Sequence, residues 1–572
     1  MAFDGFITKA VISELNNKII GSKVNKIFEP TKNEIILNLY KDATNYSLIL
    51  CANPELCRIC LTTHSKPNPQ NAFNYCMLLR KYLAGGKIIS INNYDLERTI
   101  EIQFECYNEL NDLVIRKLFV EIMSRQSNII LTNENNIIID TLKHFDNNSR
   151  ELLPAHEYSF VPINKKSFIE LQSKEDFISI IRTNENTSLT KILTNTFIGF
   201  SKTFIKETLK LLNINENDFT NNNLEILFYY IKEIITNMGT QNIICKEISN
   251  KDYTIFLKKY LNTDSNSSLE INYFLDDFYY NKETNSIFTN SRNNLLKIVS
   301  SSLKKVYKKL ENIDQKLKEC NQMDTFRLYG ELLTANLYKL NPNDNVSEYT
   351  LENYYDNNSL VTIPLDKSIS IQKNIEKYFK KYNKLRNALS IVSEQKKDAE
   401  KELDYIESIV FNLSNAKNLN DIHEVYQEIS ENIVTKKTIS KQEKNKASKK
   451  KNSNDNIEFE TQVIDGYTIY IGKNNIQNDY ISLKLSNPND IWFHAQKIHG
   501  SHILLKNPEN LDLSEIPENI LFNCASLAKK NSKAEKALNV PVDYCYARYV
   551  KKVSGAKPGM VIYNNFKTII VH

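Results

Sequence analysis

Two stretches of regular hydrophobic spacing constrain the fold of this 572-residue chain more than any other feature. In both, apolar residues alternate spacings of three and four, which is the pattern of a coiled-coil seam. The first seam comprises Leu296, Val299, Leu303, Val306, Leu310, Ile313 and Leu317. The second comprises Ile375, Tyr378, Tyr382, Leu385, Leu389, Val392, Lys396, Ala399, Leu403, Ile406, Val410 and Leu413, with Lys396 as its one break. Because a non-heptad insert separates the seams, we predict one antiparallel hairpin, a long arm, rather than two dimerisation zippers.

The rest of the chain predicts a multidomain α+β protein, since 572 residues exceed what one compact core accommodates. Alternating strands such as Glu34–Tyr40 and Thr99–Phe104 follow an early amphipathic helix, and later the period becomes helical. Gly199 would allow a tight turn between two of these later helices. The predicted parts are an α/β domain (1–172), a small helical module (173–265), the coiled-coil arm (285–433) with its tip insert (321–370), a flexible basic linker (434–457) and an α+β domain (458–572).

The composition excludes several classes of protein. A hydrophobic content of 41% is that of a globular chain rather than a disordered one. No run of about 18 apolar residues predicts a transmembrane helix, and the first residues lack the basic and apolar regions of a secretory signal. The nine cysteines are scattered, and the lone Cys57-Arg-Ile-Cys60 pair favours buried thiols over a metal or redox site. These features predict a cytoplasmic protein without a membrane segment.

A search for catalytic motifs is mostly negative. The chain has neither the Gly-x-x-x-x-Gly-Lys-Ser/Thr loop that cradles phosphates nor the Gly-x-Gly-x-x-Gly fingerprint of dinucleotide binding. His494, His499 and His502 could in principle meet at a metal ion, but the sequence offers them no obvious carboxylate or thiolate partner. Hydrogen bonding to backbone or RNA is the favoured role of these histidines. We therefore expect that the protein is not an enzyme and that it holds no metal and no cofactor.

Positive charge gathers near the C-terminus, although the net charge of the whole chain is only +5. A local cluster of lysines suits phosphate binding, and a merely solvated surface is the competing interpretation. Amides close to such a cluster can bond bases or sugar hydroxyls. The candidate RNA-binding residues are Lys473, Asn474, Asn475, Gln477, Asn478, His494, His502, Lys529, Lys530, Lys533, Lys551, Lys552 and Lys557. Trp492, the only tryptophan, could stack on a base, but its place within a strand favours the core.

A series of short motifs runs along the chain: Asp4-Gly5, Glu97-Arg98, Glu121–Asn128, Arg327–Asn336, Ile471–Tyr480, Asp490–His502 and Val550–Tyr563. In this order they resemble the NEMF/RqcH family of ribosome quality-control factors, once catalogued in bacteria as fibronectin-binding proteins. The resemblance covers essentially the whole chain. It implies that the first two modules are similar in fold to formamidopyrimidine-type DNA glycosylases, with a helix–two-turn–helix element. Glycosylase chemistry needs an N-terminal proline amine, whereas Ala2 stands at that position here.

The resemblance also implies a function on large ribosomal subunits whose nascent chain has stalled. It implies that the protein binds the subunit, its ribosomal RNA and peptidyl-tRNA, and recruits alanyl-tRNA. The protein would then direct mRNA-independent alanine tailing of the nascent chain for degradation, while the ribosome makes the peptide bonds. A small accessory RNA-binding factor is a further candidate partner. The alternative is a fibronectin-binding cell-surface adhesin, which predicts an export signal or wall anchor, and neither is visible in the sequence.

The same resemblance assigns tRNA binding to the N-terminal domain. The residues it implies are Asp4, Glu97, Arg98, Glu121, Ile122, Met123 and Arg125. A carboxylate beside a guanidinium fixes the planar fork for contact with phosphate or a base, and a surface ion pair is the ordinary alternative. The family usually has aspartate where Glu97 stands, and glycine where Ser124 and Ala155 stand.

Overall fold

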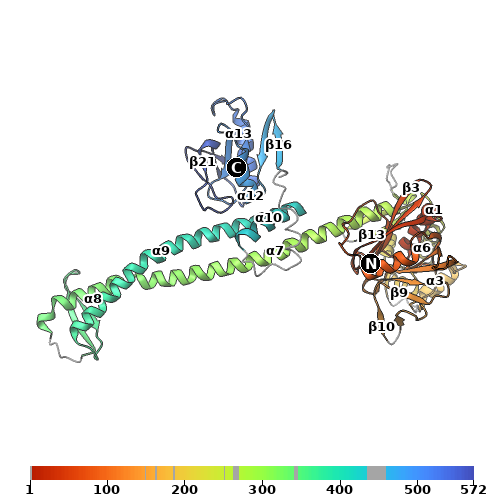
Figure 1. Ribbon diagram of the computed structural model, residues 1–572, viewed down its shortest axis with the longest axis horizontal. Coiled ribbons are helices and arrows are strands. Elements are labelled where there is room, and N and C mark those ends of the chain that lie inside the picture. Colours follow the sequence, from red (N-terminus) through yellow and green to blue (C-terminus); the bar gives the residue numbers. More distant parts are fainter. Residues whose placement is uncertain are drawn as a thin grey trace. The chain divides into compact units, whose positions relative to one another are not determined.

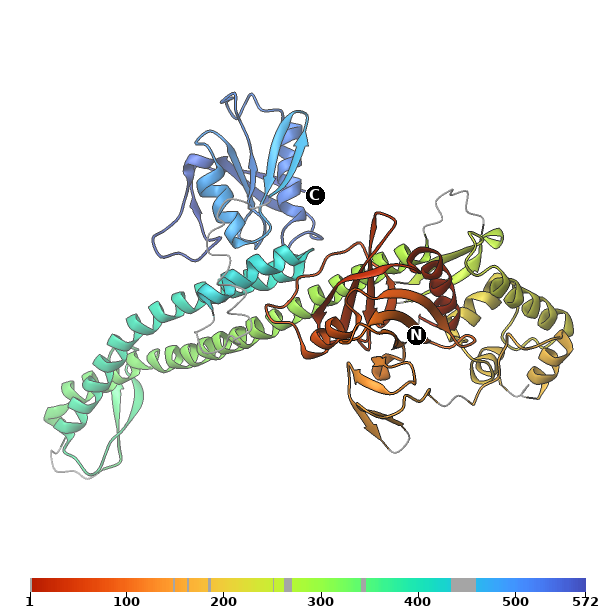
Figure 2. The ribbon, with the colours of Figure 1, turned by 45° about the vertical axis from the view of Figure 1, so that its right-hand side comes forward.

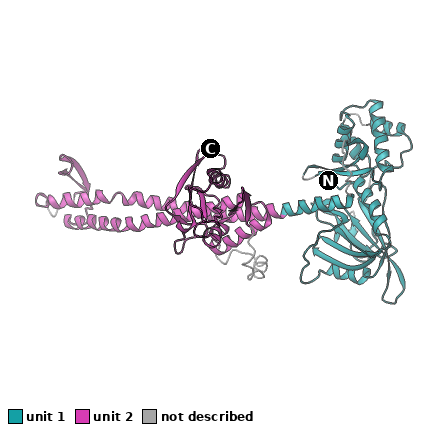
Figure 3. Ribbon diagram, turned by 90° about the horizontal axis from the view of Figure 1, so that it is seen from above, with its two compact units in different colours: residues 1–286 teal, residues 287–572 magenta. Residues whose placement is uncertain are grey.

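The computed structural model describes residues 3–147, 150–161, 164–183, 187–249, 252–261, 270–340, 346–433 and 459–572. The chain divides into two compact units, residues 1–286 and 287–572 (Figure 3). The predicted basic linker at 434–457 lies outside the described residues. Among the helices that are described, none is both long and apolar enough to cross a membrane.

The first unit is built on one antiparallel sheet with the strand order β4-β3-β2-β1-β5-β6-β7-β8-β9. Its strands are β1 (Lys23–Thr31), β2 (Glu34–Lys41), β3 (Thr44–Cys51), β4 (Arg58–Leu61), β5 (Lys87–Asn93), β6 (Thr99–Tyr107), β7 (Leu113–Glu121), β8 (Asn128–Thr132) and β9 (Ile138–Thr141). Helices α1 (Gly5–Ile19) and α2 (Asn74–Leu83) pack against it. Strands β2 and β6 contain the two segments whose alternation predicted strands.

A mainly helical part follows the sheet, but it also contains two β-hairpins. Its elements are β10 (Phe145–Asn147), β11 (Arg150–Leu152), α3 (Lys174–Arg182), α4 (Leu189–Thr196), α5 (Lys202–Leu211), α6 (Asn221–Thr236), β12 (Ile243–Ser249) and β13 (Asp252–Leu257). The prediction of a helical module over 173–265 is therefore wrong at the hairpin formed by β12 and β13. Tyr253, Ile255 and Leu257 alternate along β13 and are buried in the core shared with α1 and α5, so two-residue spacing governs this segment.

The long helix α7 (Ile271–Cys320) begins within the first unit, before the boundary at 285 expected for the arm. Its first turn buries Ile271 and Leu275 in the core of the sheet domain. Glu14 of α1 accepts the backbone N–H groups of Ile271 (2.8 Å) and Asn272 (3.0 Å). This carboxylate satisfies donors that a helix N-terminus otherwise leaves unpaired. The start of the arm is therefore a packed element of the sheet domain.

The same helix also covers the edge strand β4 of the sheet. The side chain of Asn272 accepts the backbone N–H of Leu61 (3.0 Å), and that of Asp276 accepts the N–H of Thr63 (2.7 Å). Edge strands carry unpaired backbone groups that can recruit another chain, and covering them removes that hazard. Two side chains of α7 thus supply the partners that a further strand would have supplied.

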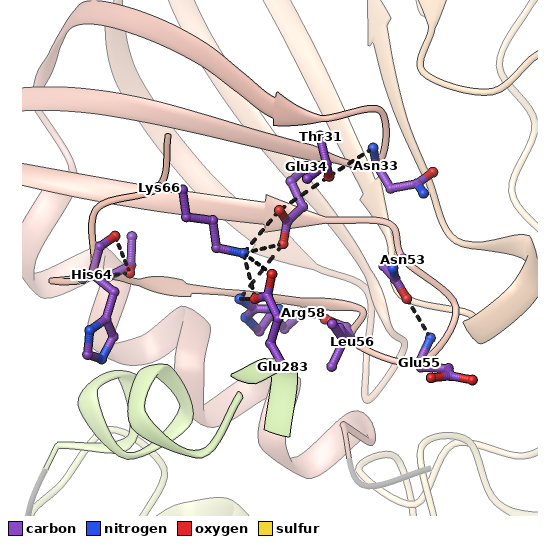
Figure 4. Close-up of polar contacts among 11 residues, drawn as sticks. Thr31, Asn33, Glu34, Asn53, Glu55, Leu56, Arg58, His64, Lys66 and Glu283 are labelled. Atoms are coloured by element: carbon purple, nitrogen blue, oxygen red, sulfur yellow. Dashed lines mark hydrogen bonds and ion pairs between the residues drawn. The ribbon is translucent and has the colours of Figure 1, made fainter. Parts of the chain in front are cut away.

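Four charged side chains meet beside this junction (Figure 4). The Arg58 side chain is 2% exposed and lies 4.0 Å from carboxylate oxygens of both Glu34 and Glu283. Lys66 donates to Glu34 at 2.9 Å and to Glu283 at 2.6 Å, and the Arg58 guanidinium lies 4.9 Å from the Tyr279 ring centre. Two cations and two carboxylates balance one another, which is what allows charges to be buried. The network joins the sheet to α7, because Glu283 belongs to that helix.

The second unit contains the predicted coiled-coil hairpin. Its elements are the end of α7, α8 (Met323–Ala335), β14 (Glu348–Asn353), β15 (Ser359–Pro364), α9 (Ile371–Asn415) and α10 (Leu419–Asn432). Helices α7 and α9 lie side by side (Figure 1) and bury residues of both seams in shared clusters. Lys396, the one break in the heptads, donates to Asp314 of α7 at 2.8 Å. Lys309 pairs with Glu402 at 2.9 Å, and these two pairs fix an antiparallel register.

The last domain is a six-stranded antiparallel sheet with helix α13 (Glu518–Lys530) against it (Figure 2). Its strands, in the order β16-β17-β19-β18-β20-β23, are β16 (Glu460–Ile464), β17 (Tyr467–Ile471), β19 (Ile503–Leu505), β18 (Ile491–Ala495), β20 (Val540–Tyr546) and β23 (Lys567–Val571). Trp492 is fully buried in a small cluster with Leu504 and Cys545, as its place in a strand predicted. The multidomain α+β class is thereby confirmed.

Gly199 offers a test of how tightly α1 is joined to the helical part. A Cβ at Gly199 would lie 2.4 Å from the Leu96 carbonyl oxygen, and its φ is +80°. We expect Gly199→Ala to destabilise the first unit by about 3 kcal/mol, from backbone strain and this overlap. Gly85→Ala is the matched control, because Gly85 also has φ +80° and its nearest neighbour lies at 3.9 Å; its expected cost is about 1 kcal/mol. Urea unfolding followed by circular dichroism measures the free energy of unfolding of both variants. An equal decrease in the two would contradict the predicted overlap at Gly199.

Candidate nucleic-acid interfaces

Asp4 joins two helices in the interior of the first unit. It is 5% exposed, and its carboxylate accepts the backbone N–H of Ile7 (3.0 Å) and the hydroxyl of Ser201 (2.6 Å). The first contact caps α1, and the second ties that cap to the start of α5. Burial raises the pKa of Asp4 to about 6. The structure therefore corrects the expectation that Asp4 contacts RNA directly, since its oxygens are engaged inside the protein.

The Glu97–Arg98 pair lies in the tight turn between β5 and β6, where both residues are partly exposed. The N–H of Glu97 donates to the carbonyl of Tyr94 (2.9 Å), and the carbonyl of Arg98 accepts the N–H of Ile122 (3.0 Å). The second bond brings the pair beside the other predicted tRNA-binding motif. Burial raises the pKa of Glu97. The structure thus gathers two predicted segments on one part of the first unit.

Glu121 and Ile122 of that second motif face the interior. Glu121 is 1% exposed and accepts from Arg150 (3.0 Å) and from the Tyr158 hydroxyl (2.8 Å). Ile122 is fully buried in the core of the sheet domain. The expectation of direct tRNA contact is corrected for both residues, because they are buried beneath the surface that a tRNA could reach.

The exposed part of this motif is its short 3-10 turn, η1 (Ser124–Gln126). Arg125 is exposed there and Met123 is partly exposed, so both can be reached by a partner. Ser124 has φ +55° and Ala155 has φ +67°, in the left-handed region that favours glycine. The resemblance led us to expect glycine at both positions, and this backbone conformation is one that glycine adopts without strain.

The four amides predicted to bind RNA are buried in the second unit. They are Asn474, Asn475, Gln477 and Asn478, each 5% exposed or less. Asn474 and Gln477 both donate to Glu424 of α10, Gln477 at 2.8 Å. Asn475 donates to Glu428 of the same helix at 2.8 Å. Asn478 donates to the backbone carbonyl of Gly500 at 3.2 Å. This corrects the expectation that these amides meet RNA, since acceptors inside the protein already take their hydrogen bonds.

The histidines predicted to bind RNA are held inside the last domain. The backbone N–H of His502 donates to the Asn478 side chain (3.0 Å), and the Nδ1 atom of His502 lies 2.7 Å from the Ser482 hydroxyl. Burial lowers the pKa of His494 to about 4 and that of His502 well below its usual range. Both rings are therefore neutral at pH 7 and carry no positive charge for a phosphate. The expected RNA contact is corrected for His502, which is buried, and stays a prediction for the partly exposed His494. Within the described ranges, no three His, Cys, Asp or Glu residues are placed to hold a metal ion.

A basic groove of about 550 Å³ runs between the arm and the last domain of the second unit. It contains the predicted Lys473, Lys530 and Lys533. Lys417, from the turn between α9 and α10, and Lys536 complete its lysines, while its carboxylates are Asp421, Glu460 and Glu535. Five lysines against three carboxylates leave the groove positive, as a nucleic-acid backbone requires. Lys417 could not be predicted as part of this groove, because only folding brings it beside the last domain.

Lys557 lies in a second groove, of about 810 Å³. Its ammonium lies 5.7 Å from the ring centre of Tyr405 on α9. Lys305 of α7 and Lys401 of α9 also line this groove. These arm lysines were missed because they occupy ordinary solvent-facing heptad positions, which carry no signal of a groove.

The remaining predicted lysines differ in how far they are already engaged. Lys552 forms an ion pair with Asp479, and Lys529 donates to the backbone carbonyl of His572 at 2.8 Å. Lys551 is exposed on β21 (Val550–Lys551). Lys551 is therefore the most accessible of these three for a phosphate.

The comparisons with known proteins cover nearly the whole chain. Residues 4–451 match the family model for the NFACT N-terminal and middle domains, and residues 457–565 match that of the NFACT protein RNA binding domain. The Rqc2 homolog RqcH of Bacillus subtilis is 35% identical, over 100% of this chain and 98% of its own length. The Rqc2 homolog RqcH of Streptococcus suis is 31% identical with the same coverage. The crystal structure of the fibrinogen binding protein from Staphylococcus aureus is 27% identical over 49% of this chain and 99% of its own, with a TM-score of 0.41.

Glu428 gives a prediction about pH. Burial raises the pKa of Glu428 to about 7, so its folded environment favours the protonated acid. Its contribution to stability is therefore fully present below the unfolded pKa, near 4.5, and is lost as pH rises through about 7. Glu428→Gln keeps an oxygen acceptor for Asn475 and stays neutral, so it should stabilise the last domain by about 2–3 kcal/mol more at pH 8 than at pH 5.

Trp492, which is the only tryptophan and is fully buried, reports unfolding of the last domain by its fluorescence. Glu431→Gln, an exposed change on the same helix α10, is the matched control and should show no such pH dependence. A pH-independent difference between Glu428→Gln and the unaltered protein would contradict the account of this carboxyl group.

Proposed function

The chain belongs to the NFACT family, and we propose that it acts in ribosome quality control by binding RNA on large ribosomal subunits that carry a stalled nascent chain. The observation that carries this proposal is the match of both NFACT family models, in order, along nearly the whole chain. The full-length similarity to proteins called Rqc2 homolog RqcH supports it.

In the proposed mechanism, the first unit holds transfer RNA. Glu97 and Arg98 stand on a turn whose backbone is fixed by hydrogen bonds, and exposed Arg125 lies in the adjoining motif. A guanidinium held in place loses little freedom when it binds a phosphate or a base edge. The tRNAs that it binds are peptidyl-tRNA and alanyl-tRNA. The outcome is an alanine tail on the nascent chain, which marks that chain for degradation.

The arm and the last domain meet ribosomal RNA in this mechanism. The lysines of the basic groove, with Lys551 and Lys557, neutralise phosphates and release counterions. Peptide-bond formation remains with the ribosome, so the protein selects and positions tRNA without being an enzyme. Its place of action is the cytoplasm, with a small accessory RNA-binding factor as a further partner.

Arg98 provides the test of this function. We expect Arg98→Ala to weaken tRNA binding about 10- to 100-fold, the effect of losing a hydrogen bond to a charged group, and to abolish most alanine tailing. Lys81→Ala removes one positive charge from another exposed site of the first unit and should leave both unchanged. Filter binding of labelled tRNA and mass spectrometry of a stalled reporter chain measure the two effects.

Sedimentation of a lysate under translational stalling locates the protein itself. We expect the unaltered protein in the large-subunit fractions. A protein confined to the cell envelope and absent from those fractions would contradict the proposal and favour the adhesin. Normal tailing by Arg98→Ala would contradict the role given to that residue.

A further inference from the structure

Two aromatic rings lie exposed and in contact on the first unit. Tyr94, in the turn between β5 and β6, is 56% exposed, and Phe160, which follows β11, is 37% exposed. Their ring centres are 5.0 Å apart at an interplanar angle of 81°. Single exposed aromatic residues are ordinary, but two rings brought together from distant parts of a sequence form a specific surface.

The Phe160 ring is held in place from behind by buried residues. It packs edge-on against Phe119 (5.9 Å) and Tyr158 (5.2 Å), which stack on each other at 4.0 Å. The Tyr158 hydroxyl donates to Glu121 (2.8 Å), and Arg150 donates to the backbone carbonyl that immediately precedes Phe160 (2.8 Å). The buried Glu121 thus fixes the segment that presents Phe160.

The Tyr94 ring stands on an equally constrained turn. Its carbonyl accepts the N–H of Glu97 (2.9 Å), and the Asn93 side chain donates to the carbonyls of Asp95 and Glu97, both at 3.1 Å. Asp95 itself has φ +53°. Because the turn is already fixed, it loses little conformational entropy when a ligand stacks on the Tyr94 ring.

Side chains of both charges lie near the two rings. Arg98 ends the turn that carries Tyr94, and the exposed Lys165 donates to the backbone carbonyl of Thr194 (2.7 Å). Burial and, after it, the charge of Arg98 lower the pKa of Lys165, so the two cations repel each other. Glu97 and Asp95 stand in the same turn. Lysine and arginine side chains can bind a phosphate, while neighbouring carboxylates can accept hydrogen bonds from the amino groups of bases.

We propose that Tyr94 and Phe160 form a stacking platform for an unpaired base of the bound tRNA, with Arg98 on the adjoining phosphate. The inference rests on the proposed function and adds residues to its tRNA site. Every base has a flat face that stacks on aromatic rings, whereas duplex RNA offers no free face except at its ends. The rings alone would also suit a peptide, but Tyr94 stands on the same turn as the proposed tRNA-binding pair Glu97–Arg98, and this position favours RNA.

The test compares two RNAs on the full-length protein at fixed salt. Tyr94→Ala and Phe160→Ala should each bind tRNA about 10-fold more weakly, the effect of losing one stacked ring. Both should bind a fully paired RNA duplex of the same length as the unaltered protein does. Tyr94→Trp and Phe160→Tyr keep a ring and should retain tRNA affinity. Tyr107→Ala, which removes a ring that is 72% exposed at the other end of β6, is the matched control and should change neither affinity.

The Tyr94→Trp variant supplies a second readout. Because the native Trp492 is fully buried in another domain, quenching of an exposed tryptophan on adding tRNA would report stacking at position 94. The platform is overturned if the alanine variants bind tRNA normally, if they lose duplex and tRNA affinity equally, or if the tryptophan at 94 is not quenched. If Arg98→Ala still weakens tRNA binding in those cases, the proposed function survives. Failure of the unaltered protein to bind tRNA overturns both.

Discussion

The entry of α7 into the core of the first unit is the constraint on which the rest of the structure depends. Its Asn272 and Asp276 satisfy backbone N–H groups at the edge strand β4, and Glu14 accepts the first N–H groups of the helix. Beside them, Arg58 is buried between two carboxylates, one of them Glu283 of α7. Removing one partner of such a network leaves an uncompensated charge, which costs about 3–5 kcal/mol. The arm therefore starts from the sheet domain without an intervening loop.

The same logic separates the residues that hold the molecule together from those that can touch RNA. Asp4, Glu121 and His502 stand in motifs that suggest recognition, yet each is buried and hydrogen-bonded inside the protein. A buried polar group has to form its hydrogen bonds within the protein, so those bonds stabilise the fold and are not available to RNA. Glu121, for example, fixes the segment that presents the exposed Phe160. A change at a buried residue of this kind is expected to lower stability, whereas a change at an exposed residue such as Arg98 is not.

The sequence predicted the arm, the strands β2 and β6 and the core position of Trp492 because each leaves a local pattern. Heptad spacing is such a pattern, and even its break at Lys396 is explained by a bond to Asp314. Contacts between segments far apart in the chain leave no such trace. The partners of the buried amides, such as Glu428, lie about fifty residues away from them, and the basic groove needs Lys417 from another helix. The hairpin β12–β13 was missed because β12 is mostly exposed and nearly every residue of β13 is buried, so neither strand shows a clear alternation of buried and exposed residues.

The central claim is that the first unit holds tRNA while the arm and last domain contact the ribosome. Ultraviolet cross-linking of the full-length protein in cells tests it most directly, with sequencing of the attached RNA and mass spectrometry of the attached peptides. The account predicts tRNA on the peptide containing residues 94–98, and ribosomal RNA on peptides containing lysines of the basic groove such as Lys530. RNA adducts that contain no tRNA, or tRNA adducts absent from residues 94–98, would contradict it.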